Sequence, residues 1–228
     1  MRKLVLWGHD VAEYQAMFAL DETVFQAPIL EFGCGPSAVN AELSVLGHEV
    51  TSVDPLFALP DVALKAHVLA LFLARADEVR ANPFQFDVRH YGGIEAFIAH
   101  RERGLQTFFA DFPKGFVQGR YQAGDGLALP FTASQFGVAL CSHFLFADLA
   151  SQTPERHVQL IIELARVAKE VRIFPLIDKI GQVSPLLGPV LLGLQERNFG
   201  EEVREVAHAL YPAGNAMLRV WAKQCDVS

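Results

Sequence analysis

The stretch that decides the fold runs from Pro28 to Pro55 and reads PILEFGCGPSAVNAELSVLGHEVTSVDP. Its apolar residues at 29, 30 and 32 predict a short buried strand, which ends where a tight glycine turn begins. A helix follows the turn, because Pro36 suits a first helical turn and Gly47 suits the position just past a helix end. The apolar residues at 50 and 53 then predict a second strand, which ends at Asp54.

The glycine turn has the features of a ligand-binding loop. Gly33 and Gly35 allow close backbone approaches that a Cβ would block. The start of the next helix offers free N–H groups and the positive end of the helix dipole. Asp54, at the end of the second strand, is placed to accept hydrogen bonds from ribose hydroxyls. The stretch therefore predicts a nucleotide-type cofactor site.

Two classes of nucleotide cofactor fit this site. Residues 33–38 satisfy the G-x-G-x-x-A pattern of dinucleotide-binding proteins, and Asp54 follows roughly 20 residues later, as that pattern requires. Glu31 argues for another class, because a dinucleotide-binding strand is usually apolar at this position. The segment GDGLALPF at 124–131, which precedes a further apolar strand, points the same way.

Four motifs together resemble those of the class I S-adenosylmethionine (SAM)-dependent methyltransferases, most of all the small-molecule branch. They are Glu-x-Gly-x-Gly at 31–35, Asp54, the segment 124–131, and a strand that runs into Cys-Ser-His at 141–143. The resemblance implies an α/β fold with a doubly wound, mostly parallel seven-stranded sheet. It also implies an antiparallel strand pair at the C-terminus.

The resemblance makes SAM the expected cofactor and assigns roles around the first turn. Glu31 is expected to orient the methionine end of SAM, directly or through water. Gly33 and Gly35 let the backbone approach that end, and Asp54 binds the ribose hydroxyls. Ser37 stands where the common pattern has a third glycine, a departure that puts the affinity for SAM in doubt.

The resemblance also assigns the adenine side of the site. Asp125 is expected to hydrogen-bond the adenine amino group, and the backbone N–H of Gly126 to meet the ring. A turn acid that caps the next segment is the alternative for Asp125. Cys141 and Ser142, where the fourth strand ends, complete the expected cofactor-binding residues.

His143 leaves the carboxyl end of the fourth strand, the edge at which ligands bind in open α/β sheets. Its ordinary pKa near neutrality makes it the candidate general base. The alternative is a histidine that caps the loop or positions the substrate. No group of Cys and His residues has the spacing of a metal site, so no metal is expected.

The chain, residues 1–228, is expected to form a single methyltransferase-like domain. Residues 1–27 predict a helical lead-in, and 57–118 are too long for the one helix that a plain crossover needs. We therefore expect 57–118 to be a helical insertion. It forms either a lid that shapes the acceptor pocket or the surface of a homodimer.

Composition excludes several classes of function. The formal net charge is −7 and no long Lys/Arg run occurs, which argues against a nucleic-acid partner. The sequence has no long apolar run of membrane-spanning length and no secretion signal. Its three cysteines are widely spaced and predict no disulfide framework. A cytoplasmic protein is the expectation.

The sequence thus predicts a SAM-dependent methyltransferase that acts on a small-molecule acceptor. An NAD(P)-dependent oxidoreductase is one alternative, supported by the G-x-G-x-x-A pattern and Asp54. A non-catalytic SAM-binding or interaction protein is another, in which the insertion forms a partner surface.

Overall fold

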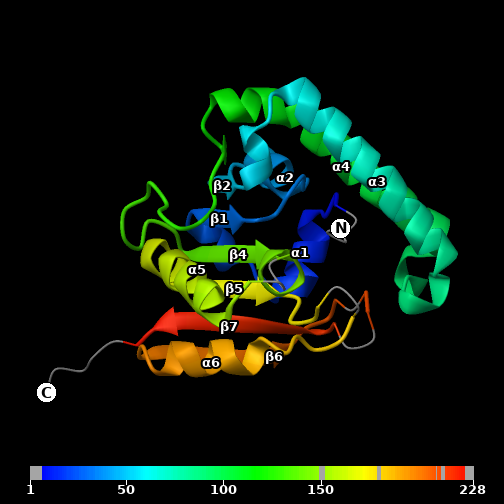
Figure 1. Ribbon diagram of the computed structural model, residues 1–228. Coiled ribbons are helices and arrows are strands. Elements are labelled where there is room, and N and C mark those ends of the chain that lie inside the picture. Colours follow the sequence, from blue (N-terminus) through cyan, green and yellow to red (C-terminus); the bar gives the residue numbers. More distant parts are fainter. Residues whose placement is uncertain (1–6, 149–151, 179–180, 209, 212–213, 224–228) are drawn as a thin grey trace, which may run out of the picture.

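The computed structural model describes residues 7–148, 152–178, 181–208, 210–211 and 214–223. Its centre is a seven-stranded sheet with the strand order β3-β2-β1-β4-β5-β7-β6 (Figure 1). The strands are β1 (Ile29–Phe32), β2 (Val50–Val53), β3 (Tyr121–Gln122), β4 (Val138–Ser142), β5 (Val171–Phe174), β6 (Phe199–Glu205) and β7 (Ala216–Ala222). All pairs among β1 to β5 are parallel, whereas β7 pairs antiparallel with both β5 and β6. The predicted fold class, with its antiparallel C-terminal pair, is confirmed.

Helices cover both faces of the sheet. They are α1 (Val11–Phe18), α2 (Val39–Val45), α3 (Asp61–Ala81), α4 (Ile94–Val117), α5 (Pro154–Val167) and α6 (Leu187–Gln195). Because strand residues alternate between faces, Leu30 and Phe32 join a core with α5 and α6, and Ile29 joins another with α1 and α2. This alternation places Glu31 on the side of α1 and α2.

Local sequence signals explain where several helices begin. Asp10 caps α1, because its side chain accepts a hydrogen bond from the backbone N–H of Glu13. The Glu13 side chain accepts in turn from the backbone N–H of Asp10, and the two bonds form a capping box. Thr153 caps α5, and Pro154 occupies the first helical position. The prediction that Pro36 lies in the first turn of its helix is wrong: α2 begins three residues later, at Val39.

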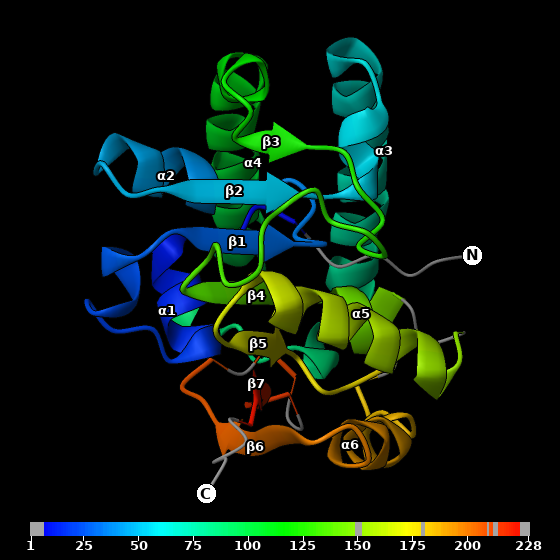
Figure 2. The same ribbon diagram turned by 90° about the vertical axis from the view of Figure 1, so that its left-hand side faces the viewer.

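The inserted segment forms a long hairpin of α3 and α4. Figure 1 shows it beyond the arrowheads of β1 and β4, and Figure 2 shows the two helices from a second side. The hairpin has an apolar core of its own, which also takes in Trp7, Cys34 of the glycine turn, Phe57 after β2 and Tyr121 of β3. The insertion and the edge of the sheet therefore share one core.

A close backbone crossing ties the N-terminal segment to α4. A Cβ at Gly8 would overlap the carbonyl of Arg101, and a Cβ at Gly104 would overlap the carbonyl of Gly8. Gly8 also has φ of +95°, a conformation that favours glycine. Only glycine at both positions lets the two backbones lie this close.

Some element boundaries differ from those the sequence predicts. The sequence predicts a third strand at 120–124, but β3 has only two residues. It predicts a fifth strand at 171–177, but β5 ends at Phe174, before Pro175. Apolar residues between 94 and 109 predict one or two helices, and the structure has the single helix α4. The sequence also predicts that residues 212–214 connect the last two strands, but this connection lies mostly outside the described residues. Within the described part of the chain, no helix has both the length and the apolar character needed to cross a membrane.

Candidate functional site

The residues expected to bind the cofactor gather at the carboxyl edge of neighbouring strands. Asp54 directly follows β2, Gly33 directly follows β1, and Ser142 ends β4. Since β1 pairs with both β2 and β4 in register, these three strand ends lie side by side. This is the edge at which open α/β sheets bind ligands.

Glu31 is fully buried inside this edge. Its carboxylate accepts hydrogen bonds from the hydroxyls of Ser37, at 2.9 Å, and Ser52, at 2.5 Å. Ser37 comes from the glycine turn and Ser52 from β2, so the carboxylate links the two. Burial raises the pKa of Glu31 above its ordinary value, because water no longer solvates the charged form.

Asp54 holds the glycine turn in place. One oxygen accepts from the backbone N–H of Gly35 and the other from that of Leu56, each at 2.8 Å. Burial raises the pKa of Asp54 to about 6, although both N–H donors act in the opposite direction. The turn has φ of +63° at Gly33 and +57° at Gly35. These left-handed values explain the need for glycine at both positions.

Aromatic rings fill the space that the two glycines open. A Cβ at Gly33 would overlap the ring of Phe144, and a Cβ at Gly35 would overlap the indole of Trp7. Trp7 is 8% exposed. A ligand that approaches the backbone of the turn must therefore displace Trp7, Phe144 or both.

The N–H groups near the start of α2 are less free than the sequence predicts. Gly35 donates its N–H to Asp54, and Ala38 donates its N–H to the carbonyl of His9 at 2.8 Å. The carbonyl of Pro36 in turn accepts from Gly8 at 3.0 Å. The segment before α1 thus lies directly along the glycine turn.

The residues expected on the adenine side have different surroundings. Asp125 is exposed and accepts from the N–H of Leu127 at 3.1 Å, the turn-acid geometry given above as its alternative. Gly126 is buried against the ring of Phe32, with φ of +79°. Cys141 lies fully buried in the core on the α5 side of the sheet. Its thiol is part of that core.

His143 lies at the end of β4 in a buried, aromatic environment. Its Nδ1 is 2.8 Å from the hydroxyl of Ser142, and its ring stacks on that of His9 with centroids 4.9 Å apart. Burial lowers the pKa of His143 to about 3. The imidazole is therefore neutral at physiological pH.

His9 is a site residue that the sequence reasoning did not single out. It is 2% exposed, and neither of its ring nitrogens has a hydrogen-bond partner among the described residues. A buried polar group without a partner is costly, so such an imidazole is a natural contact for a bound ligand. The sequence offers a weak signal, a histidine between Gly8 and the capping residue Asp10.

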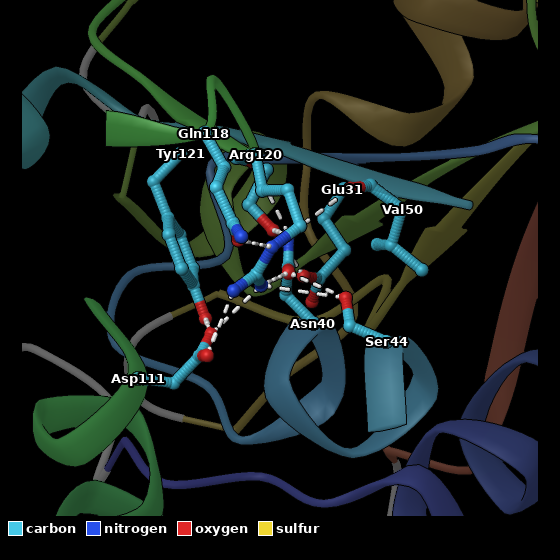
Figure 3. Close-up of polar contacts among 9 residues, drawn as sticks. Glu31, Asn40, Ser44, Val50, Asp111, Gln118, Arg120 and Tyr121 are labelled. Atoms are coloured by element: carbon cyan, nitrogen blue, oxygen red, sulfur yellow. Dashed lines mark hydrogen bonds and ion pairs between the residues drawn. The ribbon is translucent and has the colours of Figure 1, made fainter. Parts of the chain in front are cut away.

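A polar network connects Glu31 with the inserted helix α4 (Figure 3). Ser52, which donates to Glu31, accepts in turn from the side-chain amide of Asn40 at 2.8 Å. Asn40 also accepts a hydrogen bond from Arg120, whose guanidinium pairs with both oxygens of Asp111 at 2.7 Å. The network therefore runs from the buried carboxylate through β2, α2 and Arg120, the residue before β3, to α4.

A cleft of about 720 Å³ opens between α1, α4 and the segment after β6. Small side chains line much of it, including four alanines of α1 and α4. Its polar lining includes Asp10, Glu13, His100 and His208. Glu13 stays ionised: burial raises its pKa, but the Arg101 guanidinium and the contacts with His100, His9 and Tyr91 together outweigh burial and lower the pKa below its ordinary value.

Comparison with known proteins finds similarity at low identity. No protein-family model matches the chain. An uncharacterised protein of Methanocaldococcus jannaschii is 24% identical to it over 96% of each chain.

Three solved structures are similar to the chain at 12–15% identity. A SAM-dependent methyltransferase of Methanosarcina mazei is 15% identical, with 89% of this chain and 98% of that one covered and a TM-score of 0.45. A TehB-like SAM-dependent methyltransferase of Corynebacterium glutamicum is 15% identical, with 87% and 80% covered and a TM-score of 0.45. Magnesium protoporphyrin IX methyltransferase of Synechocystis, with bound SAM, is 12% identical, with 86% and 70% covered and a TM-score of 0.44.

The strand order and the single antiparallel strand β7 establish the fold without these similarities. The chain has the Rossmann-like α/β fold that the resemblance to class I SAM-dependent methyltransferases predicts.

Proposed function

We propose that the protein is a SAM-dependent methyltransferase that acts on a small-molecule acceptor. The observation that carries this proposal is the pair of buried carboxylates, Glu31 and Asp54, on either side of the glycine turn. Among the described residues, their hydrogen-bond donors are hydroxyls and backbone N–H groups, with no Lys or Arg. Such a site favours a ligand that brings positive charge and hydroxyl donors. SAM brings both, with its sulfonium, its ammonium group and its ribose.

The same geometry disfavours a dinucleotide. A pyrophosphate at a glycine turn needs free N–H groups and tolerates no nearby anion. Here the N–H of Gly35 is used by Asp54, and the N–H of Ala38 by His9. Two negative charges on the phosphates would also face Glu31 and Asp54 in a buried setting.

The chain's own residues account for binding and orientation in this proposal. Asp54 accepts hydrogen bonds from the ribose hydroxyls with the oxygen lone pairs that its bonds to the N–H groups of Gly35 and Leu56 do not use. Glu31 orients the methionine end through its own oxygens or through Ser37. Asp125, exposed at the next strand end, remains the proposed partner of the adenine amino group.

Methyl transfer needs little covalent help from the protein. When bound, SAM supplies a methyl group that is already activated on a positively charged sulfur. The site has to hold the acceptor in line and exclude water, which contributes up to about 7–11 kcal/mol in well-oriented reactions. The buried, aromatic surroundings of His143 and Trp7 suit the exclusion of water.

We assign His143 first to positioning the acceptor. A neutral imidazole has a lone pair that accepts a hydrogen bond from an acceptor O–H or N–H. With a pKa of about 3, it has little driving force to remove that proton completely. Its role as general base stays a prediction. The cleft beside α1 and α4 has the volume of a small-molecule site, which supports a small acceptor.

The test is isothermal titration of the purified protein with S-adenosylhomocysteine, with NADH as the control ligand. We expect micromolar or tighter binding of S-adenosylhomocysteine alone. Asp54→Asn and Glu31→Gln are expected to weaken binding at least roughly tenfold, by removing a charge-assisted hydrogen bond. Glu22→Gln, at an exposed acid outside the site, serves as the matched control. Binding of NADH alone, or unchanged affinity in both site variants, would refute the proposal.

A further inference from the structure

Three side chains at the mouth of the cleft bring possible metal ligands together. They are Asp10 and Glu13, at the start of α1, and His100 of α4. One ligand atom from each lies within 4.8 Å of the other two. His100 Nε2 is 3.1 Å from Asp10 Oδ2 and 3.5 Å from Glu13 Oε2.

These separations match those between ligands of one metal ion. Nitrogen and carboxylate ligands lie about 2.0–2.2 Å from zinc, and tetrahedral angles then put neighbouring ligand atoms roughly 3.4 Å apart. The two distances from His100 fall on either side of that value. An ion can therefore enter with small movements of the three side chains.

The Nε2 atom of His100 contacts both carboxylates at once. It is buried and, among the described residues, makes no hydrogen bond of good geometry, although two carboxylate oxygens lie close to it. Neither oxygen therefore lies near enough to the direction in which an N–H at Nε2 points. A nitrogen with this orientation suits an ion held between the oxygens.

The carboxylates are fixed by their other contacts. Asp10 Oδ1 accepts the N–H of Glu13 at 2.9 Å, which leaves Oδ2 for His100. Glu13 Oε1 accepts from the hydroxyl of Tyr91, and Oε2 pairs with the buried guanidinium of Arg101. Such outer contacts orient ligands in metal sites. The cleft lining carries the carboxylates of Asp10, Glu13 and Asp87 against Arg103, with Arg101 buried beside Glu13, so these carboxylates outnumber the arginines and favour a cation.

A fourth side chain in the same cleft supplies an independent observation. His208 is 5% exposed and lines the cleft with Asp10, Glu13 and His100. Its Nε2 atom is buried and has no hydrogen-bond partner within the part of the chain that the structure describes. A buried imidazole nitrogen left without a partner at a cleft is a site for a ligand or for a metal-bound water.

We infer that Asp10 Oδ2, Glu13 Oε2 and His100 Nε2 bind one divalent transition-metal ion of the zinc type. One imidazole and two carboxylates suit zinc better than magnesium or calcium, which prefer oxygen ligands alone. Three protein ligands leave a coordination position open toward the cleft. Metal binding itself does not depend on the proposed methyl transfer. If the cleft does take the acceptor, the open position is a place for an acceptor oxygen.

The experiment measures zinc binding to protein without a polyhistidine tag, stripped with a chelator and titrated against a colorimetric zinc indicator. We expect about one equivalent of Zn²⁺. His100→Ala and Asp10→Asn are expected to weaken binding roughly tenfold or more. Asn is as good a helix cap as Asp, so Asp10→Asn keeps the start of α1. His67→Ala, at an exposed histidine of α3, is the matched control and should bind zinc like the wild type.

A second readout separates coordination from folding. Co²⁺ bound in place of zinc should give visible absorption bands in the wild type and in His67→Ala, but not in His100→Ala. Circular dichroism checks that each variant is folded. Zinc affinity unchanged in both site variants, or no stoichiometric zinc in the wild type, would overturn the inference and leave an ion pair with protonated His100. S-adenosylhomocysteine titration of the same samples reports separately on the proposed function.

Discussion

At the scale of single residues, the proposed role of Asp54 predicts that the affinity for the cofactor depends on pH. Burial raises its pKa to about 6, so the ionised fraction falls as the pH drops through that value. Ribose hydroxyls donate to the ionised form. We therefore expect the affinity for S-adenosylhomocysteine to be constant above about pH 7 and to fall toward tenfold per unit below about pH 6. Titration calorimetry between pH 5 and pH 8 measures this.

The Asp54→Asn variant is the control for that pH profile. It has no carboxyl group at position 54. Its affinity for S-adenosylhomocysteine should therefore be weaker and should change little with pH near pH 6. Glu31 also has a raised pKa, and the pH profile of Glu31→Gln shows how much of the pH dependence of binding comes from Glu31. A wild-type affinity that stays level from pH 7 down to pH 5 would contradict the role given to Asp54.

Trp7 is a built-in reporter of the glycine turn. It is one of two tryptophans; the other, Trp221, packs against Gly200 on β6. A ligand that reaches Gly35 displaces the indole of Trp7 toward water, so its emission should move to longer wavelength. We expect this shift in Trp221→Phe, where Trp7 is the sole tryptophan, when S-adenosylhomocysteine is added. In Trp7→Phe the emission should stay unchanged, and a shift seen there instead would place the ligand elsewhere.

Residue patterns predicted the positions of the two carboxylates in the candidate site better than those of its histidines. Glu31 and Asp54 stand at strand ends that the apolar runs define, so sequence order alone brings them together. His9 reaches the site because Gly8 crosses α4 and His9 accepts the N–H of Ala38, contacts between distant parts of the chain. The spacing of apolar residues within a segment cannot predict such contacts. The low pKa of His143 likewise follows from burial, which the sequence does not show.

At the scale of elements, the Arg120–Asp111 pair joins the segment just before β3 to α4. Both side chains are about four-fifths buried, and Asp111 also accepts from the hydroxyl of Tyr121 at 2.9 Å. Asp111→Asn leaves the mostly buried guanidinium of Arg120 without its counter-charge. We expect the free energy of unfolding to fall by about 1–2 kcal/mol, measured by urea denaturation.

A second ion pair of the insertion serves as the control. Arg80 of α3 pairs with Glu95 of α4, but both side chains are largely exposed, at 44% and 70%. Exposed ion pairs contribute little to stability, so Glu95→Gln should lower the free energy of unfolding by less than about 0.5 kcal/mol. Equal losses in the two variants would mean that the polar network of Figure 3 adds nothing beyond a surface ion pair.

Element boundaries were predictable where several signals agree. For α3, apolar residues at helical spacing predict a helix from Asp61 to Arg80, and Asn82-Pro83 predicts its end. Both agree with the observed bounds within one residue. For α2, Pro36 is compatible with a helix start but does not impose one, and the turn held by Asp54 delays the helix to Val39. The two-residue β3 pairs with β2 alone at the sheet edge, which limits its length.

At the scale of the whole molecule, ligand binding should stabilise the fold. A ligand present at 100 times its dissociation constant adds about 2.7 kcal/mol to the free energy of unfolding. For a chain of 228 residues this raises the melting temperature by roughly 5–10 °C. We expect S-adenosylhomocysteine to produce this rise in scanning calorimetry and NADH to leave the melting temperature unchanged. The reverse result would support the oxidoreductase alternative.

The crossing of Gly8 and Gly104 has a consequence for protein engineering. It fastens the N-terminal segment to the α3–α4 hairpin, and the hairpin shares its core with the glycine turn, the segment after β2, and β3. Excising the hairpin to make a minimal domain would expose Trp7, Phe57 and Tyr121 together. Grafting a hairpin from a relative would require a matching pair of glycines at the crossing. Chimeras of this protein should therefore exchange the N-terminal segment and the hairpin as a single cassette.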